Sequence, residues 1–249
     1  MTKQAVQQAQ LHKQLWAIAN DLRGNMDASE FKNYILGIIF YRYLSENLER
    51  IIEKEYLSED KISFEEAWKN PEYKEVLIQE LTENSDIGYL IEPEYLYSKM
   101  IQLIKVGKFD ISVLSKAINS LGESTIGHSS QEDFEGLFDD MDLNSSRLGR
   151  SEKERSALIS KIMLKINEID FMHEDAEIDV LGDAYEYMIG QFAASAGKKA
   201  GEFYTPQAVS EILARIVTLG KKEIRDVYDP TCGSGSLLLR IAKHAKVGK

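Results

Sequence analysis

The stretch Val227–Leu239 places the strongest constraint on how this chain can fold. An apolar run ends at Asp229, the glycines Gly233 and Gly235 follow, and a second apolar run then begins. Glycine lets the backbone turn tightly and approach a ligand without interference from a Cβ atom. The pattern predicts a strand, a tight turn and a helix over Leu237–Ala245, which together form a cradle for a small molecule.

The elements around this turn limit which small molecule fits. We expect the strand over Arg225–Tyr228, although Asp226 interrupts its apolar pattern, and we expect Ser234 or Ser236 to cap the helix. A dinucleotide fingerprint has a third glycine where this chain has Leu238, so the pattern disfavours NAD. A Walker A loop needs Gly-Lys followed by Ser or Thr, which this sequence lacks.

A second segment of interest, Glu202–Gln207, lies upstream of the turn. Thr205 is suited to a helix N-cap and Pro206 to the first helical position, and an aliphatic helical pattern follows. An ordinary helix start explains these two residues. The aromatics Phe203 and Tyr204 and the acidic Glu202 lie just before this helix start, which suggests a ligand site rather than a simple cap. Such a site favours a bound carboxylate, because the N–H groups at a helix N-terminus are free.

Residues 1–175 show helical periodicity and no convincing strand pattern. The segment 28–55 carries a wide apolar face, which predicts a central, buried helix. Ser63 and Glu66 have the spacing of a capping box before a short helix. Other helices are predicted over 5–23, 94–106, 110–121 and 151–169. We therefore expect a mainly α chain, with an all-helical domain over 1–175 and a second domain over 176–249.

The net charge of −11 is unevenly distributed along the chain. Residues 197–249 contain 10 basic and 5 acidic side chains, whereas residues 1–196 contain 20 basic and 36 acidic ones. Nucleic-acid affinity depends mainly on contacts of Lys and Arg with phosphates. The acidic N-terminal part is therefore poorly suited to bind DNA by itself, and a partner or the later residues would have to supply the contacts with phosphates.

The composition also bears on location and metals. One cysteine cannot form a disulfide within the chain, and no apolar run approaches the roughly 20 residues of a membrane span, so we expect a cytoplasmic protein. The acidic segment 122–150 lacks the calcium-loop pattern and is interpreted as a solvated loop. The four histidines lack the spacing of zinc ligands, so no metal site is predicted; they are His12, His128, His173 and His244.

The string Asp229–Ser236 resembles motif I of the amino-methyltransferases that use S-adenosylmethionine (AdoMet). Glu202–Gln207 resembles their motif X, and its place upstream of motif I is that of the adenine-N6 class. Essentially the whole chain is similar to the modification (M) subunit of type I restriction-modification systems, HsdM. Further matches lie in the opening segment Leu15–Met26 with the long helix Phe31–Leu44, and in the segments Asp140–Gly149 and Asp179–Tyr187.

This resemblance implies a helical N-terminal domain followed by the start of a Rossmann-like α/β methyltransferase domain. It implies that the enzyme transfers a methyl group from AdoMet to an adenine flipped out of the duplex. The implied partners are DNA, reached through the complex, the specificity (S) subunit, the restriction (R) subunit and a second M subunit. The implied AdoMet-binding residues are Glu202, Phe203, Tyr204, Thr205, Pro206, Gln207, Asp229, Gly233, Ser234, Gly235 and Ser236, with Asp229 near the methionine ammonium group.

The sequence departs from this family at the catalytic loop. The family's Asn-Pro-Pro-aromatic motif is absent, and the four prolines are Pro71, Pro93, Pro206 and Pro230. The acidic residue that would hold the AdoMet ribose, expected about 20 residues after the glycines, would fall at or beyond Lys249. We therefore expect an N-terminal piece of a longer subunit that contains no catalytic residue and is inactive alone.

Other interpretations remain open. The chain as it stands could be a helical module that docks to the specificity subunit, the nuclease subunit or DNA. Cys232 is a candidate nucleophile of the kind found in cytosine-C5 methyltransferases, but it lies inside the turn and follows Thr231, so a small turn residue is favoured. A nucleotide-dependent oxidoreductase is disfavoured by Leu238.

Overall fold

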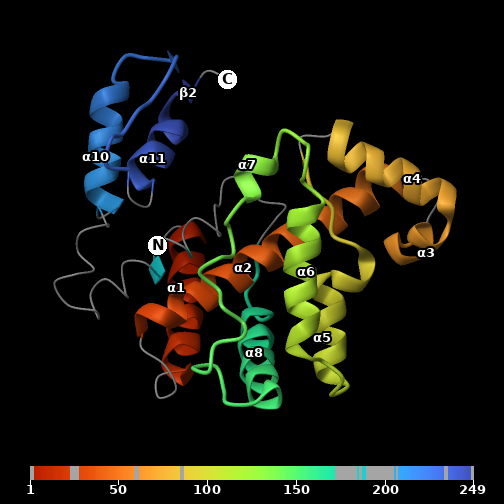
Figure 1. Cartoon of the computed structure of the whole chain (residues 1–249). Coiled ribbons are helices and arrows are strands. Elements are labelled where there is room, and N and C mark those ends of the chain that lie inside the picture. Colours follow the sequence, from red (N-terminus) through yellow and green to blue (C-terminus); the bar gives the residue numbers. More distant parts are fainter. Residues whose placement is uncertain are drawn as a thin grey trace. The chain divides into compact units, whose positions relative to one another are not determined.

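A computed structural model describes residues 3–22, 28–58, 62–84, 87–171, 184, 187–188, 205, 207–232 and 235–247 (Figure 1). The chain divides into two compact units, Met1–Leu181 and Gly182–Lys249, and each is described by itself. The described residues are mainly helical, which confirms the fold class predicted from the sequence. None of the helices in these ranges has the length and apolar content needed to cross a membrane.

The first unit is a bundle of helices, and its described residues contain no strand. In chain order its elements are α1 (Lys3–Leu22), α2 (Ala28–Ile51), the π-helical turn η1 (Ile52–Tyr56), α3 (Phe64–Lys69), α4 (Pro71–Gln79), the π-helical turn η2 (Glu80–Asn84), the 3₁₀ turn η3 (Pro93–Tyr95), α5 (Tyr97–Lys105), α6 (Ile111–Glu123), α7 (Gln131–Phe134) and α8 (Glu152–Ile166).

Helix α2 lies at the centre of this bundle and packs against α1, α5 and α8. Eight of its apolar side chains are at most 7% exposed; they are Phe31, Tyr34, Ile35, Ile38, Ile39, Tyr41, Leu44 and Leu48. Burying one such side chain contributes roughly 1.5–3 kcal/mol relative to leaving it in water. The central, buried helix predicted from the apolar face of residues 28–55 is therefore confirmed.

Two tyrosines carry hydrogen bonds into the backbone around α2. The phenol of Tyr41 donates to the carbonyl oxygen of Tyr95 at 2.8 Å, and that of Tyr89 donates to the carbonyl oxygen of Leu44 at 3.0 Å. Burial raises the pKa of Tyr41, and it raises the pKa of Tyr89 to about 12. Both phenols therefore stay neutral and keep donating at ordinary pH.

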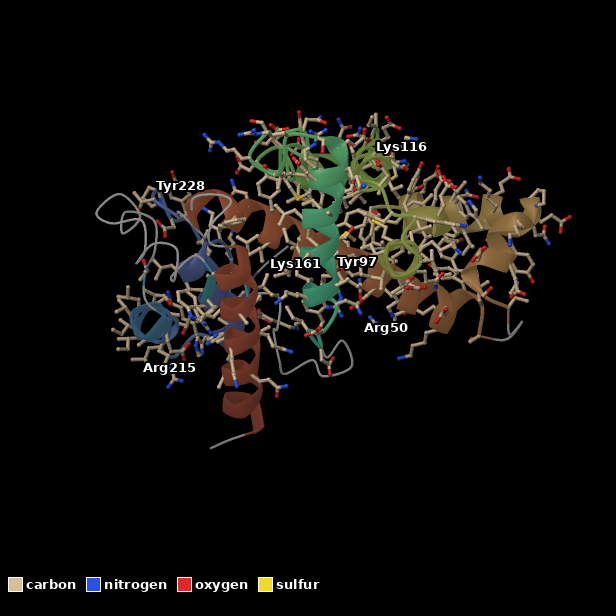
Figure 2. All side chains as sticks on the ribbon, turned by 90° about the horizontal axis from the view of Figure 1, so that it is seen from below. Arg50, Tyr97, Lys116, Lys161, Arg215 and Tyr228 are labelled. Atoms are coloured by element: carbon tan, nitrogen blue, oxygen red, sulfur yellow. The ribbon has the colours of Figure 1, made fainter. Side chains whose placement is uncertain are left out.

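Tyr97 joins α2 to α5 and α8. Its backbone N–H donates to Oγ of Ser45 at 2.7 Å, and its phenol donates to the carbonyl oxygen of Met163 at 2.7 Å. Ser45 is fully buried, so this bond gives its hydroxyl a partner in the core. Tyr97 is labelled in Figure 2 within the first unit, and its side chain is only 1% exposed. One tyrosine thus connects three helices.

Arg42 is the buried cation of this core, at 6% exposure. Its Nε atom donates to Oε1 of Glu46 at 2.6 Å, and its guanidinium also donates to the carbonyl oxygen of Ile166. The guanidinium carbon lies 4.5 Å from the centre of the Phe171 ring, a cation–π distance. Arg42 therefore holds the end of α8 and the residues after it against α2.

The segment after α6 packs back onto α2. The phenol of Tyr34 donates to the carbonyl oxygen of Asp142 at 2.8 Å, and a Cβ on Gly37 would meet Sδ of Met141 at 2.8 Å. Met141, Leu143 and Leu148 are buried, whereas the carboxylates of the segment are exposed. The acidic loop is therefore solvated as expected, and its apolar residues attach it to the bundle.

Capping boxes begin two helices of this unit. At α3, Ser63 Oγ accepts from the backbone N–H of Glu66 and Oε2 of Glu66 accepts from the N–H of Ser63, so the predicted capping box is confirmed. Ser151 and Glu154 form the same arrangement at α8. Such caps supply partners for N–H groups that the helix itself leaves free.

The second unit contains α10 (Gln207–Thr218), β1 (Glu223–Ile224), α11 (Ser236–His244) and β2 (Lys246–Val247). The two strands are parallel, with Glu223 opposite Lys246 and Ile224 opposite Val247. A parallel pair needs a crossover, and here α11 provides it. The described elements therefore form a βαβ unit preceded by a helix.

Two details of the predicted turn were wrong. The strand lies at Glu223–Ile224 rather than at Arg225–Tyr228, because β2 pairs only with Glu223 and Ile224 among the described residues. The residue that caps α11 is Gly235, which offers no side chain, rather than Ser236, which is the first helical residue. Ser234 lies outside the described residues.

Candidate cofactor site

The turn before α11 is organised by Asp229. Its Oδ1 atom accepts a hydrogen bond from the backbone N–H of Thr231 at 2.9 Å and from the Thr231 hydroxyl at 3.2 Å. The backbone N–H of Gly235 donates to the carbonyl oxygen of Cys232 at 2.8 Å. An Asp side chain that bonds the backbone two residues later is a common device of tight turns. Asp229 therefore shapes the turn in which the sequence places a ligand cradle.

Gly235 is a position where the backbone requires glycine. Its φ angle is +74°, and a Cβ built there would meet no atom within 4 Å. Left-handed backbone is strained for other residues, so the requirement comes from conformation rather than from crowding. The space beside Gly235 is open, and α11 begins there without a side-chain cap. The N–H groups of its first turn are thus available to an anionic group.

The structure describes only part of the residues predicted to bind AdoMet. Asp229, Gly235 and Thr205 are described, and Thr205 is half-buried before the start of α10. Gln207 and Ser236 are the first residues of α10 and α11. The rest lie outside the described residues, and these are Glu202, Phe203, Tyr204, Pro206, Gly233 and Ser234.

Helices α10 and α11 pack against each other. The buried residues of α10 are the small ones, Ser210, Ala214 and Thr218, spaced one helical turn apart. The Thr218 hydroxyl donates to the carbonyl oxygen of Ala214 at 2.8 Å, which gives that buried hydroxyl a partner. The small side chains let the two helix backbones approach closely.

The opposite face of α10 is aliphatic and exposed. Its large side chains are between 42% and 63% exposed; they are Val209, Ile212, Leu213, Ile216 and Val217. Tyr228, labelled with Arg215 in Figure 2, is 86% exposed. The aliphatic period of this helix was evident in the sequence, but its solvent exposure was not.

A hydrogen-bonded pair between α10 and α11, Glu211 and His244, could not be found from local sequence patterns. Oε1 of Glu211 lies 3.0 Å from Nε2 of His244 and 2.6 Å from Nε of Arg215. The hydrogen bond from His244, and then that from Arg215, lowers the pKa of Glu211 below its usual range. The spacing of Glu211 and Arg215 is an evident i,i+4 pair in the sequence. No local pattern pointed to His244, because its partner lies on another helix.

The described residues also include the side-chain types of metal-binding and thiol sites. No group of three His, Cys, Asp or Glu side chains there is arranged to hold a metal ion. Cys232 is a free, exposed thiol within the turn, and its carbonyl oxygen closes that turn onto Gly235. The geometry thus offers a glycine turn, an open helix N-terminus and an adjacent helix.

Two family models cover almost all of the chain. Residues 11–166 match the HsdM N-terminal domain, and residues 176–249 match the N-6 DNA Methylase family. The boundary between the two matches falls between α8 and the second unit. Together they account for the helical bundle and for the βαβ unit with its preceding helix.

Individual relatives agree with these matches. The type I restriction enzyme MpnII methylase subunit of Mycoplasma pneumoniae is 37% identical over 97% of this chain and 45% of its own length. The MjaIX methylase subunit of Methanocaldococcus jannaschii is 27% identical over 92% of this chain and 38% of its own.

A solved structure of a type I restriction-modification methyltransferase subunit from Streptococcus thermophilus has a TM-score of 0.81 and 33% identity. The match covers 96% of this chain and 51% of that one, so the chain spans about half the length of the proteins it matches. Helical bundle, glycine turn and sequence relatives lead to the same assignment: the chain belongs to the family of methylase (HsdM) subunits of type I restriction-modification systems.

Proposed function

We propose that this chain provides the N-terminal helical domain and the AdoMet-binding turn of an adenine-N6 DNA methyltransferase subunit. The observation that carries the proposal is the turn from Asp229 to Gly235, which opens directly onto the uncapped N-terminus of α11. The relatives are methylase subunits of type I restriction enzymes, and the matching family of residues 176–249 is that of N-6 DNA methylases.

The chemistry of the described residues suits AdoMet. The ligand's carboxylate would be stabilised by the free N–H groups and the positive end of α11. Asp229 offers a carboxylate for the ligand's ammonium group, and the φ angle of Gly235 keeps the backbone beside it free of a side chain. AdoMet, when bound, supplies an electrophilic methyl group. Glu202–Gln207 and the turn residues Gly233, Ser234 and Ser236 are proposed to complete the site.

The substrate of the proposed reaction is an adenine in DNA. An enzyme that modifies a base must take it out of the duplex, at a cost of a few kcal/mol. The Asn-Pro-Pro-aromatic loop that would receive the adenine amino group is absent from these 249 residues. We therefore propose that the chain alone transfers no methyl group, and that it acts in the cytoplasm with the specificity subunit, the restriction subunit and a second methylase subunit.

Binding of AdoMet tests this proposal. A methylase subunit containing these residues at the full length of its relatives should release heat on titration with AdoMet. Replacing Asp229→Ala removes an ionic partner of the ligand and a hydrogen-bond acceptor of the turn, so its Kd should rise about tenfold or more. Thr231→Val, which removes only the hydroxyl bond to Asp229, should have a smaller effect. Absence of AdoMet binding by the complete subunit, or methylation of cytosine, would refute the proposal.

A second function is favoured by the first unit, which is an acidic bundle with a complete buried core. Such a unit is suited to docking against a protein partner, in particular the specificity subunit. A pull-down of the 249-residue chain by the specificity subunit, without AdoMet, would support this docking function. If only the complete subunit is captured, the docking surface is not contained in this chain.

A further inference from the structure

Helices α10 and α11 each begin beside one of the two segments proposed to bind AdoMet, which are Glu202–Gln207 and Asp229–Ser236. Helix α10 begins two residues after Thr205, and α11 begins immediately after Gly235. Both helices begin at the lower end of the second unit as drawn in Figure 1, and they pack side by side. The distance between the two halves of the site therefore depends on how α10 and α11 are placed against each other.

The packing between these helices is close, and α10 contributes small side chains to it. The buried residues of α10 are Ser210, Ala214 and Thr218, whose small side chains form a shallow surface. The large aliphatic residues, which interlock strongly when they pack, are on the exposed face. A directional bond between the two helices therefore adds a fixed point that small side chains do not provide.

Glu211 and His244 form such a bond. Their Oε1 and Nε2 atoms are 3.0 Å apart, and the two side chains are 31% and 26% exposed. Glu211 lies in the second turn of α10, and His244 is the last residue of α11. Arg215 bonds the same Oε1 atom at 2.6 Å, which holds the Glu211 carboxylate in place. Arg215 itself belongs to α10, so its bond does not cross between helices.

We infer that Glu211 and His244 are positioning residues of the AdoMet site. Their bond sets α10 against α11, and with them the start of α10 at Thr205 against the turn Asp229–Gly235. Neither side chain needs to touch the ligand. The inference rests on the proposed function, because it assigns the two helix starts to one ligand.

A matched pair of variants in the complete methylase subunit tests the inference. His244→Ala removes the bond between helices, whereas Arg215→Ala removes a bond of similar kind within α10. Partly exposed polar contacts contribute little, so we expect His244→Ala to raise the Kd for AdoMet about two- to fivefold. Arg215→Ala, which loosens the Glu211 carboxylate but leaves the bond between the helices in place, should raise the Kd less than His244→Ala. The KM for DNA and the kcat at saturating AdoMet should not change in either variant, because the catalytic loop is not affected.

Two more variants separate positioning from general loss of stability. His244→Gln keeps a neutral N–H donor near the position of Nε2 and should restore most of the affinity. The double variant Glu211→Ala with His244→Ala should bind AdoMet no more weakly than His244→Ala, since the two residues act through one bond. Circular dichroism and the Tm of each variant check that the fold is retained.

The outcomes are distinct. Wild-type affinity in His244→Ala, or an equal loss in Arg215→Ala, would overturn the positioning role while leaving AdoMet binding intact. The role is also overturned if His244→Gln binds as weakly as His244→Ala. If the wild-type subunit does not bind AdoMet at all, the proposed function fails and the inference fails with it.

Discussion

Helices α2 and α10 both carry a row of aliphatic side chains, but they use it in opposite ways. In α2 the row is buried, with Ile35 and Ile38 both at 0% exposure. In α10 the row faces solvent, and Ile212 and Ile216 are 58% and 63% exposed, while the small residues are buried. The first unit is therefore stabilised by its own apolar core. The second depends on small-residue contacts and polar bonds, and its aliphatic face is typical of a helix that packs against further apolar structure.

The largest expected effect of this difference is on core truncations. Ile38→Ala leaves a cavity in the centre of the bundle and should reduce the free energy of unfolding of the first unit by about 2–5 kcal/mol. Ile216→Ala, the same change on the exposed face of α10, should alter the free energy of unfolding of the second unit by less than about 0.5 kcal/mol. Urea denaturation followed by circular dichroism measures both. Equal losses would show that the exposed face is not what distinguishes the two helices.

Buried and exposed arginines provide the second comparison. Arg42→Ala removes the donor to the Ile166 carbonyl and one partner of the Glu46 carboxylate, and we expect a loss of about 2–3 kcal/mol, less than for a fully buried pair because Glu46 reaches solvent. Arg215, whose side chain is 69% exposed, should cost less than about 1 kcal/mol when changed to Ala. The same denaturation experiment applies. A loss below 1 kcal/mol for Arg42→Ala would contradict its role as the link between α2 and α8.

The starts of α8 and α11 differ in how they are capped, which gives a smaller effect. Ser151→Ala removes a side-chain cap and should cost about 1 kcal/mol. Gly235→Ser introduces a residue that is favoured at caps, yet it should destabilise α11 by about 1–2 kcal/mol because φ is +74° there. Hydrogen exchange of the α8 and α11 amides, measured by mass spectrometry, reports each helix separately. Greater protection of α11 in Gly235→Ser would refute the backbone requirement.

The smallest expected effect concerns acid titration, and its sign differs between the units. The bonds from His244 and Arg215 lower the pKa of Glu211, so their stabilisation is present at neutral pH and is lost as the pH falls through that lowered pKa. Burial raises the pKa of Glu49 on α2, so ionisation of that carboxyl is unfavourable in the folded state, and lowering the pH favours folding there. Carbon-13 NMR titration of both carboxyls measures the two shifts. His244→Ala should move the pKa of Glu211 upward without changing that of Glu49.

The elements of the first unit were predictable because local patterns determine them. The apolar period of α2 and the Ser63–Glu66 capping box involve residues within a few turns of each other. The polar bonds of the core were not, since Arg42 meets Ile166 and Tyr97 meets Met163 across long separations in sequence. No residue type alone specifies such pairings.

The candidate site was predictable to a different extent. The glycines and Asp229 indicated the turn, and the turn is there, because its bonds span only a few residues. The strand position was wrong, since strand pairing depends on a partner at Lys246 that follows the whole of α11. The pair of Glu211 and His244 was missed for the same reason: it exists only after two helices have packed.

The bond from Arg42 to the Ile166 carbonyl has a mechanical consequence. It holds the chain where α8 ends, and Phe171, 3% exposed, is held after it by an edge-on contact with Tyr43, with ring centres 6.0 Å apart. The amide of Gln14 also donates to the carbonyl oxygen of Glu168. A force that pulls on the backbone after Phe171 would therefore be passed to α2 and α1. These contacts would have to break before α8 could unwind from its C-terminal end.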